Sequence, residues 1–170
     1  IYDGIQVFLM MNYIEKYYPN SKMTGNLADL KLLKSYHFIN LPFNQQYNYL
    51  HMLMARKNLD QALNEPKNKL IKFNEQIANK YKAGLSLNYL DNFLGNQIVN
   101  SSIKEFMLLN QYSSSNARQF ETILEKNAPQ KIDWFFKTMV ESRDLIDFKF
   151  GKVTKTKDAI SFKIINKTNT

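Results

Sequence analysis

The chain has 170 residues, of which 44% are hydrophobic and 22% are charged, and its formal net charge is +8. This composition is typical of a globular domain and excludes an intrinsically disordered chain. The absence of cysteine excludes disulfides, thiolate zinc sites and cysteine nucleophiles, and no apolar run approaches the roughly 20 residues of a membrane-spanning helix.

Helical periodicity dominates the chain to about residue 143, because apolar residues recur at steps of three and four. In chain order, helices are expected over residues 3–18, 27–37, 44–58, 74–94, 100–110, 117–126 and from 133 onward. Gly95 follows the longest helix, where a left-handed C-terminal cap is expected. Asn100 or Ser101 is a candidate N-cap, and one residue of 113–116 is another.

After residue 144 the apolar period changes to two, which predicts a β-hairpin. The alternating residues are Ile146, Phe148 and Phe150 on one strand and Ile160, Phe162 and Ile164 on the other. The fold class is therefore expected to be mainly α, a helical bundle over residues 1–144 with a C-terminal hairpin. Since a two-stranded hairpin is marginal alone, residues 145–170 are expected to begin a β-rich domain. Both ends fall at predicted elements, so we expect an internal piece of a larger protein.

The basic charge is partly local, because residues 145–170 carry six lysines and two aspartates, a net charge of +4. These lysines alternate with apolar residues, which indicates a solvated strand face. A basic chain also raises the hypothesis of a helical nucleic-acid-binding module. The other lysines are spread over several predicted helices and no arginine cluster exists, so no nucleic-acid partner is expected.

Common catalytic and binding motifs are absent from the sequence. It contains no P-loop, no dinucleotide-binding glycine pattern, no G-x-S-x-G and no H-E-x-x-H. Its two histidines, His37 and His51, lie on different predicted helices; a metal site between them is conceivable, but a single His on a helix is more often a surface or core residue. The carboxylates are scattered and show no spacing that acid–base catalysis requires.

Three segments carry a resemblance. Residues 2–9 read Tyr-Asp-Gly-Ile-Gln-Val-Phe-Leu, residues 81–95 begin Tyr-Lys-Ala-Gly and end Leu-Gly, and residues 132–137 read Ile-Asp-Trp-Phe-Phe-Lys. In this order they resemble the catalytic domain of the zinc aminopeptidases related to aminopeptidase N (gluzincins). The first is similar to the N-E-G segment with the third zinc ligand, the second to the Y-x-K-G helix, and the third to a late D-W-F/W-F motif. The hairpin resembles the start of the β-domain that follows.

The resemblance implies that this chain is the C-terminal helical half of a thermolysin-like catalytic domain, after an upstream H-E-x-x-H motif. It implies zinc as the cofactor of the whole protein, Asp3 as a metal ligand, Tyr81 as the catalytic residue that stabilises the oxyanion, and a peptide as substrate. This segment alone is expected to be inactive. The family is often exported in bacteria, which suggests a periplasmic or extracytoplasmic location.

Two departures from the family pattern matter. Asp3 stands where the family has Glu, and Tyr2 stands where it has Asn. A gapless match anchored on Gly95 places Lys80 at the catalytic tyrosine. The alternative match of Tyr81 with Gly84 needs a shift of one residue and places Ala83 at the lysine of the motif.

Each candidate residue also has a purely structural interpretation. Asp3 is an ordinary helix N-cap candidate, Tyr81 lies on an apolar stripe, and Trp134, Phe135 and Phe136 are expected to be packing residues. The functional hypotheses are accordingly a zinc aminopeptidase-like enzyme, a degenerate homologue that binds peptides without cleaving them, and a basic helical binding module. Neither the substrate preference nor the oligomeric state is indicated by the sequence.

Overall fold

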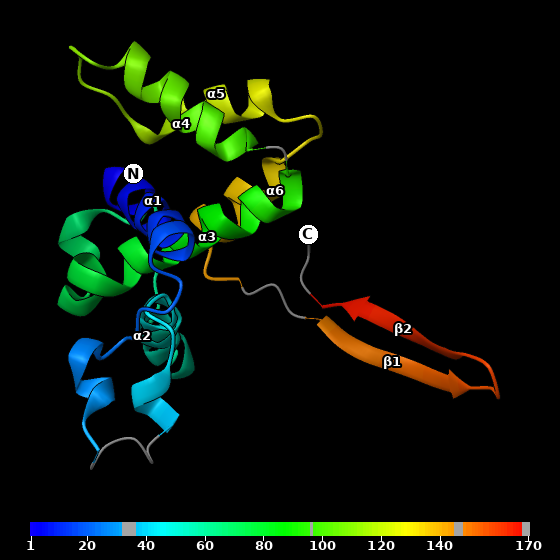
Figure 1. Ribbon diagram of the computed structural model, residues 1–170. Coiled ribbons are helices and arrows are strands. Elements are labelled where there is room, and N and C mark those ends of the chain that lie inside the picture. Colours follow the sequence, from blue (N-terminus) through cyan, green and yellow to red (C-terminus); the bar gives the residue numbers. More distant parts are fainter. Residues whose placement is uncertain (32–36, 96, 145–147, 168–170) are drawn as a thin grey trace.

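The computed structural model describes residues 1–31, 37–95, 97–144 and 148–167 (Figure 1). The fold is mainly α, with packed helices followed by an antiparallel β-hairpin, as the sequence predicts. Within the described part, the α-helices are α1 (Tyr2–Tyr17), α2 (Gln45–Arg56), α3 (Asn79–Leu94), α4 (Ile98–Leu109), α5 (Ala117–Asn127) and α6 (Asp133–Phe135). The strands are β1 (Phe148–Lys155) and β2 (Ile160–Asn166).

Shorter helical turns extend or join these elements. Single 3₁₀ turns cover Gly25–Asp29, His37–Asn40 and Lys67–Lys69. A π-helical turn, Asn74–Ala78, runs directly into α3, and a second one, Phe136–Val140, continues α6. The helix predicted over residues 74–94 is therefore confirmed, with a π-helical first turn.

Three further sequence-based predictions, two helices and one N-cap, are also confirmed. The helices predicted over residues 3–18 and 44–58 agree with α1 and α2 to within two residues. Asn116 caps α5 through a capping box, in which its Oδ1 accepts from the Gln119 amide at 3.0 Å and Gln119 Oε1 accepts from the Asn116 amide at 2.9 Å.

The helix predicted over residues 27–37 is wrong where the structure describes it. Gly25–Asp29 forms only a 3₁₀ turn, and residues 32–36 lie outside the described part. Leu27 and Leu30 are 56% and 50% exposed. These two apolar side chains are thus not buried against the core, and such burial supplies most of the stability of a short helix.

The cap predicted for α4 is also wrong, because the helix begins at Ile98 and its N-cap is Gln97, at a φ of 57°. Ser101 lies inside the first turn, where its hydroxyl donates to the Gln97 carbonyl at 3.0 Å. Gly95 does have the expected positive φ, 65°, but its ψ of −169° places it outside the left-handed helical region. Its amide donates to the Asp91 carbonyl at 2.8 Å.

A continuous apolar core joins α1 to the helices that follow α2. Its buried residues are Ile5, Phe8, Leu87, Leu90, Leu94, Val99, Ile103, Phe106, Phe120, Ile123, Leu124, Ile132, Phe135 and Phe136. Trp134 packs edge-on against Phe93 at 5.3 Å and Tyr89 at 6.2 Å between ring centroids, which confirms a packing role for the aromatic run at the start of α6. Across the described ranges, no helix combines the length and apolar character that crossing a bilayer requires.

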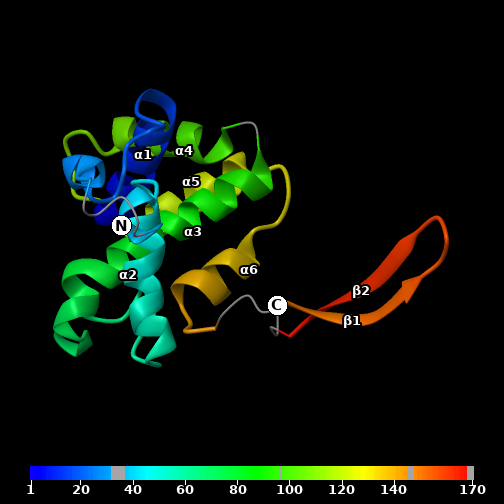
Figure 2. The same cartoon turned by 60° about the horizontal axis from the view of Figure 1, so that its bottom comes forward.

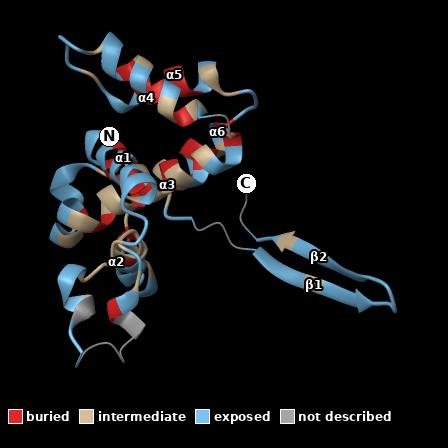
Figure 3. Ribbon diagram, viewed as in Figure 1, coloured by how far each residue is buried: buried red, intermediate tan, exposed pale blue. Residues whose placement is uncertain are grey.

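The hairpin projects away from the packed helices (Figures 1 and 2). Phe150 pairs with Ile164 and Val153 with Phe162, and a bulge lies between Phe150 and Val153. This register places the apolar side chains on one face, and that face is exposed along its whole length (Figure 3). The boundary predicted at residues 144 and 145 adjoins residues outside the described part, so it stays a prediction.

Candidate functional site

The first two segments of the resemblance lie against each other where α1 crosses α3. A Cβ added at Gly4 would stand 2.6 Å from Ala83 Cβ, and one added at Gly84 would overlap Val7. Real Cβ atoms do not approach this closely, so the crossing requires glycine at positions 4 and 84. Along the chain, Asp3 is one residue from Gly4, and Tyr81 is two residues from Ala83 and three from Gly84. Both candidate residues are therefore close in sequence to the crossing.

Asp3 lies in the first turn of α1 and is exposed. The N-cap of α1 is Ile1, and no side chain caps the helix, so the N-cap interpretation of Asp3 is wrong. A carboxylate at this position interacts favourably with the positive end of the helix dipole. Its exposure also leaves the carboxylate accessible to a ligand from solvent.

Tyr81 is half-buried near the beginning of α3. Its ring stands edge-on to that of Tyr47, at 4.9 Å between centroids, and packs against the buried cluster of Val7, Met11 and Tyr47. The ammonium of Lys80 lies 5.6 Å from the centroid of the Tyr81 ring, a cation–π distance. The two residues that compete for the family's tyrosine position are therefore in contact with each other.

Asp3 and Tyr81 have different surroundings despite the nearby crossing. Asp3 is exposed at the first turn of α1, whereas Tyr81 packs against residues of the second and third turns of α1 and against α2. Among the residues that the structure describes, no three His, Asp or Glu side chains gather closely enough to hold a metal ion. A zinc site built on Asp3 therefore needs ligands from beyond this group of described residues.

A buried ionic pair lies one residue beyond Tyr81, and sequence reasoning missed it. Lys82 is 5% exposed and Asp60 is 7% exposed. The Lys82 ammonium stands 3.9 Å from Asp60 Oδ2 and donates to the Gln61 carbonyl at 3.3 Å. Burial lowers the pKa of Lys82, and the neighbouring Asp60 carboxylate opposes this shift.

His51 of α2 belongs to the same region. Burial lowers the pKa of His51, the Lys82 ammonium lowers it further, and the Asp60 carboxylate partly raises it. The imidazole is therefore held in its neutral form near neutral pH. The side chain of His37 lies outside the described part, so the conceivable His37–His51 metal site stays a prediction.

One sequence signal could have identified Lys82. It lies between Ala78 and Ser86, four residues away on either side, and all three are buried on one face of the helix predicted over residues 74–94. A single lysine on such a face has to find a buried partner, because an unpaired buried charge is very costly. No sequence signal identifies Asp60 as that partner, since a loop carries it there.

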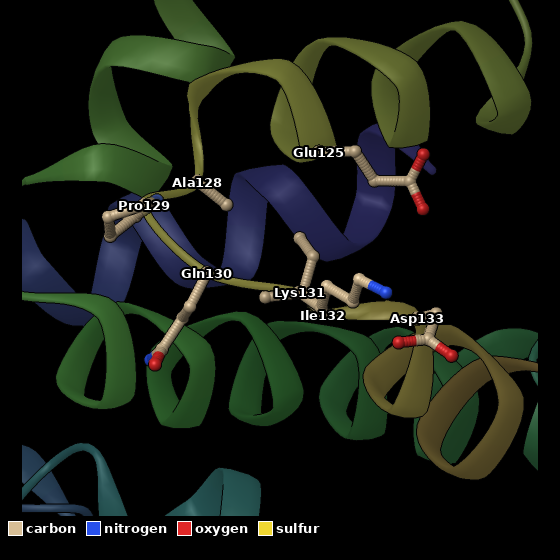
Figure 4. Close-up of a pocket in the computed structure, with 7 residues that line it drawn as sticks. All are labelled: Glu125, Ala128, Pro129, Gln130, Lys131, Ile132 and Asp133. Atoms are coloured by element: carbon tan, nitrogen blue, oxygen red, sulfur yellow. The ribbon is translucent and has the colours of Figure 1, made fainter.

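A shallow hollow lies elsewhere, along the connection between α5 and α6 (Figure 4). Its volume is about 590 Å³, and its lining residues are Glu125, Ala128, Pro129, Gln130, Lys131, Ile132 and Asp133. Asp133 is paired with Lys137 at 3.2 Å, and this partner lowers the pKa of the Asp133 carboxyl. Neither Asp3 nor Tyr81 lines this hollow.

Comparisons of the chain with models of known protein families, with curated proteins and with solved structures found no match.

Proposed function

We propose that this chain is a segment of a zinc-dependent, aminopeptidase-like metallopeptidase that hydrolyses peptide bonds. One observation supports the proposal: the first and third segments of the resemblance, far apart in sequence, both pack on α3, which carries the second. Residues 2–9 reach α3 at the Gly4 and Gly84 crossing, and Trp134 reaches it through Tyr89 and Phe93. Segments that share a catalytic site have to meet in this way.

Asp3 and Tyr81 have distinct roles in this proposal. The exposed Asp3 carboxylate suits zinc, which accepts carboxylate oxygens at about 2.0–2.2 Å, although one carboxylate is not a complete site. Zinc, when bound, polarises the scissile carbonyl and activates water. The Tyr81 hydroxyl would donate a hydrogen bond to the oxyanion of the tetrahedral intermediate. The remaining ligands and the general base would come from the segment before Asp3.

A degenerate homologue that binds peptides without cleaving them is the second candidate. Asp3 is one methylene shorter than the family's Glu, and the Tyr81 ring is packed against Tyr47 and Lys80. If Lys80 occupies the tyrosine position, as the gapless match has it, the hydroxyl donor to the oxyanion is missing. Peptide binding would then persist without turnover.

The decisive experiment measures zinc in the full-length protein by metal analysis after dialysis, beside aminopeptidase activity. Near-stoichiometric zinc is expected, and Asp3→Ala should lose most of it. Asp158→Ala, which removes an exposed carboxylate in the hairpin turn, is the matched control and should retain it. Absence of zinc from both the unaltered protein and the control would exclude the metallopeptidase.

A tyrosine variant separates the two candidates. In an active enzyme, Tyr81→Phe should lower kcat by about 10²–10³, the effect of removing one oxyanion donor, with the zinc content unchanged. Tyr47→Phe removes the neighbouring hydroxyl instead and should leave kcat near that of the unaltered protein. Zinc binding without turnover, together with saturable peptide binding, would support the degenerate homologue.

A further inference from the structure

Two segments that are about 80 residues apart in sequence lie side by side next to α3. One, residues 58–64, follows α2, and the other, residues 140–143, follows α6. The amides of Leu63 and Asn64 both donate to the Val140 carbonyl, at 2.9 and 3.2 Å. These backbone hydrogen bonds tie the loop after α2 to the segment that leads into the hairpin.

The pairing of residues 58–64 with residues 140–143 is called the seam below. On its solvent-facing side, charged side chains also join the two segments. The Arg143 guanidinium donates to the Asn58 carbonyl at 3.1 Å and to Asn58 Oδ1 at 2.7 Å. It also lies 3.6 Å from Asp60 Oδ1. Asn58 has a φ of 54°, a conformation that asparagine tolerates better than most residues, so the local backbone is shaped to present both acceptors to Arg143.

On the buried side of the seam, Lys82 joins the same two segments. Its ammonium approaches the other oxygen of Asp60 at 3.9 Å, and it donates to the carbonyls of Gln61 at 3.3 Å and Ser142 at 3.5 Å. One buried ammonium from α3 thus contacts both segments of the seam. Asp60 Oδ2 accepts no hydrogen bond from any residue that the structure describes, so the nearby charges of Lys82 and Arg143 are what balance the carboxylate.

We infer that Lys82, Asp60 and Arg143 form a latch that holds residues 140–143 to α3 and to the loop after α2. Arg143 stands five residues before Phe148, where β1 begins, so the latch holds the described segment that precedes the hairpin. Opening the latch releases residues 140–143 from the loop. The inference is independent of zinc and of peptide hydrolysis.

Because of the charges in the latch, substitutions of Asp60 and of Lys82 should open it to different extents. Two cations share one carboxylate, so Asp60→Asn leaves both cations without a counter-charge, one of them buried. Lys82→Met removes the buried cation and leaves the Asp60–Arg143 pair intact. Breaking a buried pair by removing one charge is costly when the other charge is left behind, so Asp60→Asn should open the latch further than Lys82→Met.

Hydrogen exchange of the 170-residue chain tests the latch at the Leu63 and Asn64 amides. Arg143→Gln should accelerate their exchange about tenfold, because the ion pair of the half-exposed Arg143 with the buried Asp60 resists local opening. Asp60→Asn should accelerate their exchange more. Lys137→Gln, which breaks the exposed pair with Asp133, is the matched control and should leave them unchanged. If Asp60→Asn does not fold, Arg143→Gln decides.

Two results would overturn the latch. One is unchanged exchange at both amides in Arg143→Gln and Asp60→Asn. The other is equal acceleration throughout α1 and α3, which would make these charges part of one cooperative core rather than a local latch. Because the inference concerns only the seam, either result leaves the zinc measurement unaffected.

Discussion

The helical body and the hairpin both have a well-defined apolar face, but only the helical body covers its own. Phe8, Leu90 and Phe106 are fully buried, with 0% exposure, whereas Phe150 is 72% exposed and Phe162 is 53% exposed. The two hairpin rings do contact each other, at 5.2 Å between centroids. No second layer lies over them in the part of the chain that the structure describes.

This difference indicates that most of the free energy of folding comes from the helical body. Burial of apolar area is the dominant favourable contribution to folding, and the buried residues are concentrated in the helices (Figure 3). A two-stranded hairpin with one uncovered face is marginal in water. Substitutions in the body should therefore change the free energy of unfolding, and equivalent substitutions in the hairpin should not.

The largest effect is expected at Phe8, at the centre of the core between α1 and its neighbours. Phe8→Ala should lower the free energy of unfolding by about 3–5 kcal/mol, the usual cost of removing a buried phenylalanine. Urea denaturation followed by circular dichroism measures it. A loss below about 1 kcal/mol would mean that the helical body does not depend on this core.

The α1–α3 crossing should show the next largest effect. Gly4→Ala should lower the free energy of unfolding by about 1–3 kcal/mol, because the new methyl group overlaps Ala83 Cβ in a packed contact. Ala83→Gly in the same chain removes the overlapped atom and should recover most of the loss. A double-mutant cycle on denaturation midpoints measures this coupling, and additive effects would contradict the close contact.

The crossing also shows how far the sequence could predict this fold. Periodicity predicted α1, α2 and α3 closely because each has an apolar face that the body buries. It failed over the described part of residues 27–37, where the pattern is present but Leu27 and Leu30 stay half-exposed. The partner of a face is a tertiary property, so a periodic pattern alone cannot reveal its absence.

The candidate site was predictable to a different degree. Asp3 and Tyr81 could be proposed only because short motifs around them resemble a family, and the sequence wrongly offered Asp3 as an N-cap as well. The Lys82–Asp60 pair is a more definite physical feature, yet its partner lies on a loop 22 residues earlier. Sequence separation of this kind carries no periodic signal.

Acid should destabilise the helical body through His51. Because burial and Lys82 lower its pKa in the folded chain, the unfolded chain binds a proton first as the pH falls below the ordinary value of about 6.5. The free energy of unfolding should therefore fall as pH falls from about 6.5 through the lowered pKa, with Asp60 opposing the effect. Denaturation at a series of pH values measures this slope.

The variant that tests this prediction is His51→Gln, which should flatten the dependence on pH in that window. An unchanged slope in His51→Gln would show that another group, and not the imidazole beside Lys82, is responsible for the loss in acid.

The smallest effect is expected at the apolar face of the hairpin, and it tests the comparison most directly. Phe150→Ser removes a large side chain, but one that is 72% exposed, so the free energy of unfolding of the helical body should change by no more than about 0.5 kcal/mol. Hydrogen exchange within β1 and β2 should accelerate at the same time, because the contact with Phe162 is lost. A loss comparable with that of Phe8→Ala would mean that the hairpin face packs against the helices in solution. The two regions would then form one cooperative unit.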